Sequence, residues 1–265
     1  MPTHSETLNG QCAIVSGGAG DIGAAIAKEL ARRGAAIAIG DSKTPDEAQP
    51  RVESIRALGR PCHYTQLDVS DSASVVEWIE RVETELGLPG ITIATAAVCT
   101  FKNISTISFE EWDREFEVNL DGYFYLARTV ANRLVEKNQS GCIVLIGSAA
   151  ADGVTLSLPT YCITKVAVRK LMECLSAHYA RHGIRVVDVS PGVVDAGLSA
   201  AAMRENPSIR ARAEQMVPTG ELCDPEDIAL AVAQLCEPDS HHFTGSTVYV
   251  DGGMRLKIIG EYDSA

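Results

Sequence analysis

The sequence predicts an α/β fold in which a seven-stranded parallel sheet carries helices on both faces. Short apolar runs alternate with longer stretches of helical period, which is the pattern of β-α-β units. A glycine-rich turn stands between the first apolar run and the first helical stretch. The 265 residues contain no linker, repeat or low-complexity tract. We therefore expect residues 1–265 to form a single Rossmann-like, doubly wound domain.

Each strand is indicated by an apolar run bounded by turn residues, which is typical of a buried parallel strand. The runs are "CAIVSG" (12–17), "AAIAIG" (35–40), "PCHYTQL" (61–67), "ITIATA" (91–96), "GCIVLIG" (141–147), "IRVVDVS" (184–190) and "STVYVDG" (246–252). Helical period is found at 21–33, 46–58, 72–86, 110–137, 158–182 and 225–236. A charged helical insertion at about 197–217 follows the sixth strand, where we expect a lid over the strand ends.

Composition excludes several classes of protein. A net charge of −12 argues against a nucleic-acid partner, because a binder needs a basic face to displace counterions from phosphates. No run approaches the ~18 apolar residues of a membrane span, and the start "MPTHSETLNGQ" has no leader pattern. We expect a cytoplasmic protein that acts on a small molecule. The eight cysteines are scattered singly, which favours reduced thiols.

The stretch "SGGAGDIG", residues 16–23, lies between the first strand and the first helix. Unpaired N–H groups at a helix start, with the positive end of the helix dipole, bind phosphate. Asp41 ends the second strand, 18 residues after Gly23. A carboxylate there accepts the ribose hydroxyls of adenosine and repels a 2′-phosphate. The pattern favours NAD over NADP as cofactor, although Lys43 nearby could partly compensate a phosphate.

The segment "YCITK" places Tyr161 and Lys165 one turn apart on one helix face. A phenol has a pKa near ~10, and an ammonium within about 4–6 Å lowers it by favouring the phenolate. Tyr161 then becomes a usable acid and base. Ser148 stands thirteen residues upstream at the end of the fifth strand, and Asn119 lies in the long helical stretch before it.

This set resembles the short-chain dehydrogenase/reductase family, and the resemblance covers essentially the whole chain. It implies that Ser148 polarises the substrate oxygen, that Tyr161 exchanges the proton, and that Lys165 binds the nicotinamide ribose and tunes the phenol. Asn119 would anchor a water that relays protons. The cofactor contacts it implies are Gly17, Gly20, Asp21, Ile22, Gly23, Asp41, Asp68, Val69, Thr95, Ala96, Tyr161, Lys165, Pro191 and Val194. The resemblance also implies a homotetramer.

Three positions depart from the family pattern. "ATAA", residues 94–97, replaces N-N-A-G and leaves Thr95 as its one polar side chain. Ala196 replaces a threonine that would bond the carboxamide, so orientation of the nicotinamide would rest on the Val194 backbone and on Asp195. Asp21 stands where a glycine is expected. We expect its carboxylate to turn back and cap the first helix, which would weaken cofactor binding relative to glycine.

The function expected is hydride transfer between NAD and a secondary alcohol or ketone, which could be sugar-like, polyol-like or another neutral alcohol. The residues between Ser148 and Tyr161 are small and mostly apolar, which argues against a strongly anionic substrate. A 3-oxoacyl thioester reductase of the same family is an alternative, and a catalytically quiet NAD(H)-binding protein is another. Adjacent histidines at 241–242 lack further clustered ligands, so no metal site is predicted.

Overall fold

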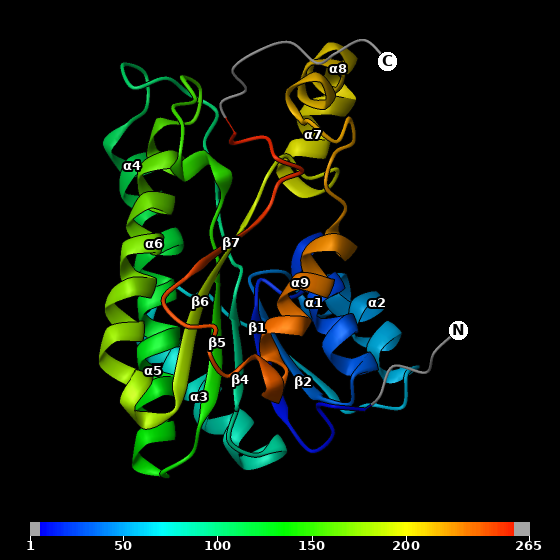
Figure 1. Ribbon diagram of the computed structural model, residues 1–265, viewed down its shortest axis with the longest axis vertical. Coiled ribbons are helices and arrows are strands. Elements are labelled where there is room, and N and C mark those ends of the chain that lie inside the picture. Colours follow the sequence, from blue (N-terminus) through cyan, green and yellow to red (C-terminus); the bar gives the residue numbers. More distant parts are fainter. Residues whose placement is uncertain (1–5, 257–265) are drawn as a thin grey trace.

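The computed structural model describes residues 6–256 and contains one seven-stranded sheet of order β3-β2-β1-β4-β5-β6-β7. Every pair of neighbouring strands is parallel, and Figure 1 shows the sheet between two layers of helices. The strands are β1 (Cys12–Ser16), β2 (Ala36–Asp41), β3 (Cys62–Gln66), β4 (Ile91–Ala94), β5 (Gly141–Ile146), β6 (Ile184–Pro191) and β7 (Thr247–Val250). The predicted fold class and all seven strands are confirmed.

Two apolar layers hold the helices against the sheet. One lies under α1 (Asp21–Arg32), α2 (Pro45–Arg56) and α9 (Pro225–Cys236), and includes the fully buried Ile26, Leu30 and Val232. The other lies under α3 (Ser72–Leu86), α5 (Gly122–Glu136) and α6 (Pro159–Tyr179), and includes Trp78 and Val130. Burial of these side chains, at roughly 25 cal/mol per Å² of apolar area, is the main force that assembles the layers.

The helical stretch predicted at 110–137 is not one regular helix. It comprises α4 (Phe109–Phe116), a π-helical segment (Glu117–Asp121) and α5. At the start of α5 the chain lies close to the loop after β3, where a Cβ on Gly122 would be 2.8 Å from a methyl of Val69. Wide π turns of this kind often occur at functional sites, and this one contains Asn119.

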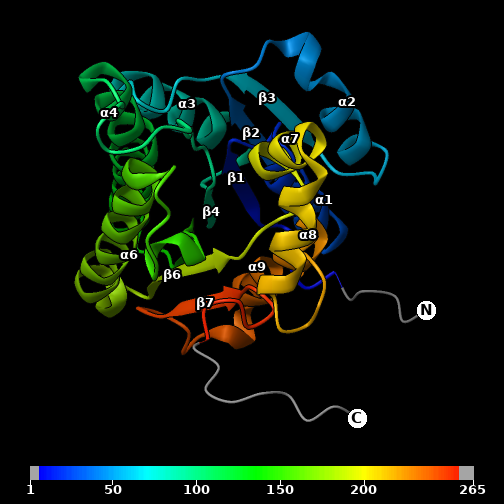
Figure 2. The ribbon, with the colours of Figure 1, turned by 90° about the horizontal axis from the view of Figure 1, so that it is seen from above.

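Strand order reverses between β1 and β4, because the chain proceeds outward from β1 in one direction and from β4 in the other. In open α/β sheets, ligands bind at this switch point, outside the carboxyl ends of the strands. The insertion predicted at 197–217 forms α7 (Gly197–Glu205) and α8 (Pro207–Met216). Both helices stand beyond that edge of the sheet (Figures 1 and 2).

All eight cysteines are free thiols, as predicted, and five of them are buried. None of the helices in the described part of the chain is long and apolar enough to cross a membrane.

Candidate active site

A cleft of about 990 Å³ opens at the carboxyl ends of the strands. All fourteen residues predicted to contact a cofactor line it, and so does Ser148. Asn119 does not line it and is fully buried. The cleft therefore brings together, in one continuous cavity, residues that follow all seven strands and are far apart in the sequence.

The glycine turn is packed so closely that side chains are excluded at two positions. Gly17 has a φ of +69°, and a Cβ on it would be 2.7 Å from the Ala96 nitrogen. A Cβ on Gly23 would be 2.3 Å from the Gly17 carbonyl oxygen. These glycines let helix α1 start directly against the turn, so that its first N–H groups face the cleft.

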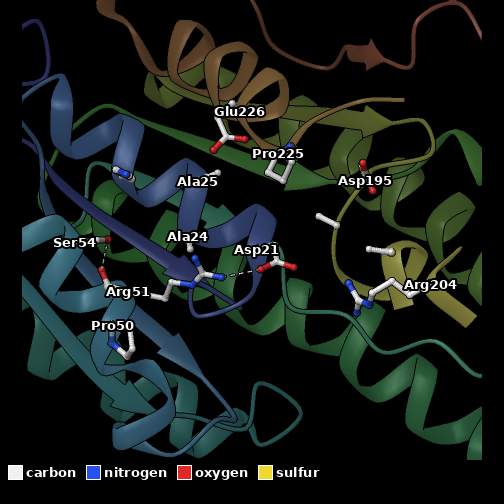
Figure 3. A pocket seen from close by; sticks show the side chains of 13 residues that line it. Asp21, Ala24, Ala25, Pro50, Arg51, Ser54, Asp195, Arg204, Pro225 and Glu226 are labelled. Atoms are coloured by element: carbon white, nitrogen blue, oxygen red, sulfur yellow. Dashed lines mark hydrogen bonds and ion pairs between the residues drawn. The ribbon is translucent and has the colours of Figure 1, made fainter. Parts of the chain in front are cut away.

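Asp21 does not cap its own helix, and the prediction that it would is wrong. The N-cap of α1 is Gly20, without a side-chain hydrogen bond. One Asp21 oxygen accepts a hydrogen bond from Arg51 of α2 at 2.8 Å, and the other accepts the backbone N–H of Gly197, the first residue of α7, at 2.9 Å. Figure 3 shows Asp21 between these elements, at the rim of an adjoining pocket of about 420 Å³. Two donors outside the turn thus hold the carboxylate, and the first-turn N–H groups of α1 stay available to a phosphate.

Asp41, the last residue of β2, lies beside the glycine turn and is 8% exposed. Its carboxylate accepts the backbone N–H of Ala19 at 3.0 Å and that of Lys43 at 3.2 Å. The Lys43 ammonium donates to the Ala19 carbonyl at 2.9 Å. The carboxylate is therefore fixed by two N–H groups where it lines the cleft, and the nearby ammonium is bound to the turn itself.

Asp68 and Val69 follow β3 and line the same cleft. Burial opposes ionisation of Asp68, but hydrogen bonds from Ser70 and from Arg114 outweigh it and hold the pKa of this carboxyl below its ordinary value. The ion pair with Arg114 measures 3.1 Å. Arg114 also lines the cleft, and nothing in its sequence context had indicated this.

Ser148, Tyr161 and Lys165 lie together on one wall of the cleft. Ser148 lies two residues after the end of β5, and its Oγ accepts the backbone N–H of Ala150 at 3.1 Å. Tyr161 is half-buried near the start of α6, while Lys165, one turn later, is 1% exposed. The Lys165 Nζ lies 5.5 Å from the centre of the Tyr161 ring, and it donates to the Ile146 carbonyl at 2.8 Å and to the Tyr123 hydroxyl at 3.2 Å.

Burial shifts both titrating groups away from their charged forms. It raises the pKa of Tyr161 above its ordinary value, and a hydrogen bond with Ser148 opposes the shift. The pKa of Tyr161 is thus raised, where the spacing of Tyr161 and Lys165 alone had predicted that it would be lowered. Burial also lowers the pKa of Lys165 to about 8, against the attraction of Asp188. Such shifts are common at catalytic acids and bases.

The side chain of Asn119 holds the loop after β4. Its Oδ1 accepts the Val98 N–H at 2.9 Å, its Nδ2 donates to the Val98 carbonyl at 2.9 Å, and a further bond reaches Thr164 of α6 at 3.3 Å. The Ser16 Oγ also accepts a hydrogen bond from the Thr95 N–H at 3.3 Å. Asn119 and Ser16 therefore brace this loop, where "ATAA" supplies few side-chain hydrogen bonds.

The segment after Pro191 differs in part from expectation. Val194 forms an isolated bridge to Cys223 and lines the cleft. Asp195 instead lines the adjoining pocket and pairs with Arg210 of α8 at 2.7 Å. The Asp195 carboxylate thus pairs with α8 and does not line the cleft. Of the two residues expected to orient a nicotinamide, Val194 and Asp195, only Val194 is placed to do so.

The sequence predicts that a lid at about 197–217 and the residues between Ser148 and Tyr161 lie at the substrate end, but it does not single out the individual apolar side chains that line the far end of the cleft. These residues come from the loop after β4, from the loop after Ser148, from α7 and α8, and from the segment after β7: Phe101, Val154, Leu158, Met203, Ile209, Ala213, Met216 and Met254. Most lie on surface loops and helices whose apolar residues have no period that distinguishes a cleft wall from an exposed face.

Comparison with known proteins identifies the family. Residues 17–255 match the family described as Enoyl-(Acyl carrier protein) reductase. The chain is 32% identical to 2,3-dihydro-2,3-dihydroxybenzoate dehydrogenase of Bacillus subtilis, over 96% of this chain and 100% of that protein. It is 27% identical to L-rhamnose 1-dehydrogenase (NADP(+)) of Thermoplasma acidophilum, over 95% and 98%. The crystal structure of a short-chain type dehydrogenase/reductase from Mycobacterium marinum superposes with a TM-score of 0.87 at 26% identity, covering 93% of this chain and 96% of that one. The chain belongs to the short-chain dehydrogenase/reductase family and is an NAD(P)-dependent enzyme that acts on CH–OH groups.

Proposed function

We propose that the protein interconverts a neutral secondary alcohol and its ketone with NAD as the preferred cofactor. The observation that carries this proposal is the placement of Ser148, Tyr161 and Lys165 on one wall of the cleft that also holds the glycine turn and Asp41. The turn fits a dinucleotide, because Gly17 and Gly23 leave no room for side chains and so keep the backbone within reach of a pyrophosphate. When bound, the cofactor would accept or supply the hydride.

The chain's own residues move the proton and hold the substrate. Ser148 donates a hydrogen bond to the substrate oxygen, and Tyr161 as phenolate takes the hydroxyl proton during oxidation. Because burial raises the pKa of Tyr161, the phenolate depends on the positive charge of Lys165. Lys165 is also the group that would hold the nicotinamide ribose.

Asn119 acts in this proposal as a positioning residue. Its amide is engaged by Val98 and Thr164, so it fixes the loop after β4 against α6, one residue before Lys165. The water relay implied by the family resemblance stays a prediction.

The preference for NAD rests on Asp41. Its carboxylate is held in place by two N–H groups and is almost fully buried, so a 2′-phosphate beside it would meet a negative charge that is only partly compensated. Lys43, the nearest candidate to compensate, is bound to the Ala19 carbonyl.

The far end of the cleft favours a neutral substrate with an apolar skeleton over a polyol. Its lining is dominated by methionine, aromatic and branched apolar side chains, including Phe101, Val154 and Met216. A polyol would lose water from its hydroxyls there and find few partners, which costs free energy. We propose that α7 and α8 act as a lid over this end, since Met203 and Ile209 line the cleft.

Absorbance at 340 nm tests the proposal. Purified protein with NAD⁺ is assayed against cyclic and steroid-like secondary alcohols, sugar alcohols and aldoses, and with NADH against 3-oxoacyl thioesters. We expect turnover with apolar neutral alcohols. Turnover of acyl thioesters alone would favour the thioester reductase, and tight NADH binding without turnover of any substrate would favour a quiet nucleotide-binding protein.

We also propose a homotetramer that pairs α5 and α6 between copies. Phe124 on α5 is 40% exposed, and Ile163 and Val166 on α6 are 42% and 50% exposed. Apolar side chains gathered on two neighbouring helices are typical of a covered interface. Light scattering after size exclusion checks the mass, and a monomer at micromolar concentration would contradict the assembly.

A further inference from the structure

Strand β6 carries a carboxylate inside the core, at Asp188. The residue is 0% exposed, between Leu145 of β5 and Thr247 of β7 in the sheet. Its Oδ2 accepts hydrogen bonds from Ser190 and Thr247, each at 3.0 Å. Its Oδ1 has no hydrogen-bond partner among the described residues. A buried, half-satisfied carboxylate is costly to the fold, so its position calls for a physical reason.

The catalytic wall is shaped to admit this carboxylate. A Cβ on Gly147 would be 2.2 Å from the Asp188 Oδ1 and 2.7 Å from the Ser190 Oγ. Gly147 immediately precedes Ser148, and it follows Ile146, whose carbonyl accepts the Lys165 ammonium at 2.8 Å. The carboxylate and the ammonium thus lie against two consecutive residues, Gly147 and Ile146, at the end of β5 and directly before the substrate-binding serine.

Asp188 and Lys165 act on each other electrostatically. Burial lowers the pKa of Lys165 to about 8, and Asp188 is the strongest group that opposes this. Burial likewise raises the pKa of Asp188, with hydrogen bonds and the charges of Arg169 and Lys165 opposing it. The other titratable groups that face Lys165 are Tyr161, Tyr123 of α5 and Cys99 of the loop after β4. None of these three is negatively charged at neutral pH, so Asp188 is the counter-charge among them.

A second contact leads from Asp188 toward the substrate side of the cleft. Arg169 lies one turn after Lys165 on α6, with its Nε 3.6 Å from the Asp188 Oδ2. Its two terminal nitrogens donate to the two carboxylate oxygens of Asp152 at 2.6 and 2.9 Å. Asp152 also accepts the Tyr249 hydroxyl at 3.1 Å, and it lines the cleft in the loop after Ser148.

We propose that Asp188 is a positioning residue for the acid–base site: its carboxylate is the buried counter-charge that keeps Lys165 an ammonium, and Arg169 joins this charge to Asp152 in the loop after Ser148. The inference rests on the proposed function, because it acts through the Tyr161 phenolate that the ammonium stabilises. With Asp188 in place the ammonium is retained and the phenolate forms at lower pH. Without its charge, Lys165 loses its proton more readily and Tyr161 needs higher pH to ionise.

The test is the pH profile of alcohol oxidation in Asp188→Asn. This variant keeps the shape of the side chain and removes its charge. We expect the acid limb of kcat to move to higher pH by about one unit, so that kcat near pH 7 falls about tenfold and recovers at high pH. The dissociation constant of NADH, from fluorescence titration, should stay within about threefold. Asp113→Asn, which removes a charge from an exposed position on α4, is the matched control and should leave the limb in place.

An acid limb that does not move in Asp188→Asn would overturn the inference, whether the rate is normal or is lowered equally at every pH. If thermal denaturation shows that Asp188→Asn is unfolded, the same pH profile is measured in Ser190→Ala instead. It deletes one hydrogen bond to the carboxylate and should shift the limb in the same direction by a few tenths of a unit, whereas an unmoved limb would overturn the inference.

Failure of the proposed function is distinguishable from failure of this inference. The proposed function fails if Tyr161→Phe retains activity or if wild-type protein turns over no alcohol, and the inference then falls with it. The inference alone fails if Tyr161→Phe is inactive while Asp188→Asn keeps the wild-type limb.

Discussion

Replacing Asp41 by Asn should relax the choice of cofactor. Asparagine keeps a carbonyl oxygen that can accept the Ala19 N–H, which the carboxylate accepts at 3.0 Å, but it has no negative charge. The turn is therefore expected to keep its shape, while the repulsion of a 2′-phosphate is lost. Affinity for NAD⁺ should fall only a few-fold, because a neutral acceptor replaces a charged one.

The size of the effect follows from Coulomb's law. Two unit charges about 4 Å apart repel by ~1 kcal/mol in water and by ~4 kcal/mol at an effective dielectric constant of about 20. Asp41 is 8% exposed, which places it between these limits, and a phosphate monoester carries about −1.5 to −2 charges. Partial compensation by Lys43 leaves at least ~1.4 kcal/mol, so kcat/KM for NADP⁺ relative to NAD⁺ should rise at least tenfold.

Steady-state rates at fixed saturating alcohol, with each cofactor varied, measure this ratio. Asp46→Asn is the control, since it removes an exposed carboxylate from the first turn of α2 and should leave the ratio unchanged. The reasoning is refuted if wild-type protein uses NADP⁺ as well as NAD⁺, or if Asp41→Asn leaves the ratio where it was.

Three further substitutions test other parts of the account. Gly23→Ala would place a methyl 2.3 Å from the Gly17 carbonyl oxygen. This overpacking costs ~1–3 kcal/mol, so the NADH dissociation constant, measured by fluorescence titration, should rise about tenfold or more. An unchanged dissociation constant would contradict the packing argument. Asp21→Ala removes the carboxylate that accepts the first N–H of α7; the Asp21 side chain is 44% exposed, so the free energy of unfolding should change by less than ~0.5 kcal/mol. The KM for the alcohol should rise about threefold or more. A KM that does not rise would show that Asp21 does not position the lid. Glu237→Gln removes the negative charge of a buried ion pair with Arg33, whose two groups are 2.7 Å apart. The free energy of unfolding, measured by urea denaturation, should fall by about 3 kcal/mol. A loss below ~1 kcal/mol would contradict this prediction.

The sequence predicts the sheet well because its signal is local. Parallel strands buried on both faces are nearly continuous apolar runs, and the turns between them contain glycine and aspartate in their usual places. Tyr161 and Lys165 are also predictable, since four residues of helix bring them to one face whatever the rest of the chain does.

The orientation of Asp21 could not be predicted, because both of its partners are distant in the sequence. Arg51 is 30 residues away and Gly197 is 176 away. The expected cap is a local interaction, and it was displaced by two hydrogen bonds that exist only once α2 and α7 are in place. The raised pKa of Tyr161 has a similar origin, since it depends on how deeply the assembled loops bury the phenol.

Asp188 is recognisable in the sequence as the one acidic residue inside the apolar run "IRVVDVS". What it contacts could not be inferred, because Gly147, directly after the neighbouring strand β5, leaves space for its carboxylate, and the positive charges near it come from α6. The break at the π-helical segment is also hidden, since the helical period at 110–137 continues on both sides of it.

The central claim is that Tyr161 exchanges the proton with the substrate, while cofactor affinity depends mainly on the glycine turn and Asp41 in the same cleft. The most direct measurement is turnover of Tyr161→Phe at 340 nm alongside its NADH dissociation constant. Phenylalanine removes only the hydroxyl, so kcat should fall at least a thousandfold, while the dissociation constant stays within about threefold of wild type. Activity within tenfold of wild type would contradict the claim.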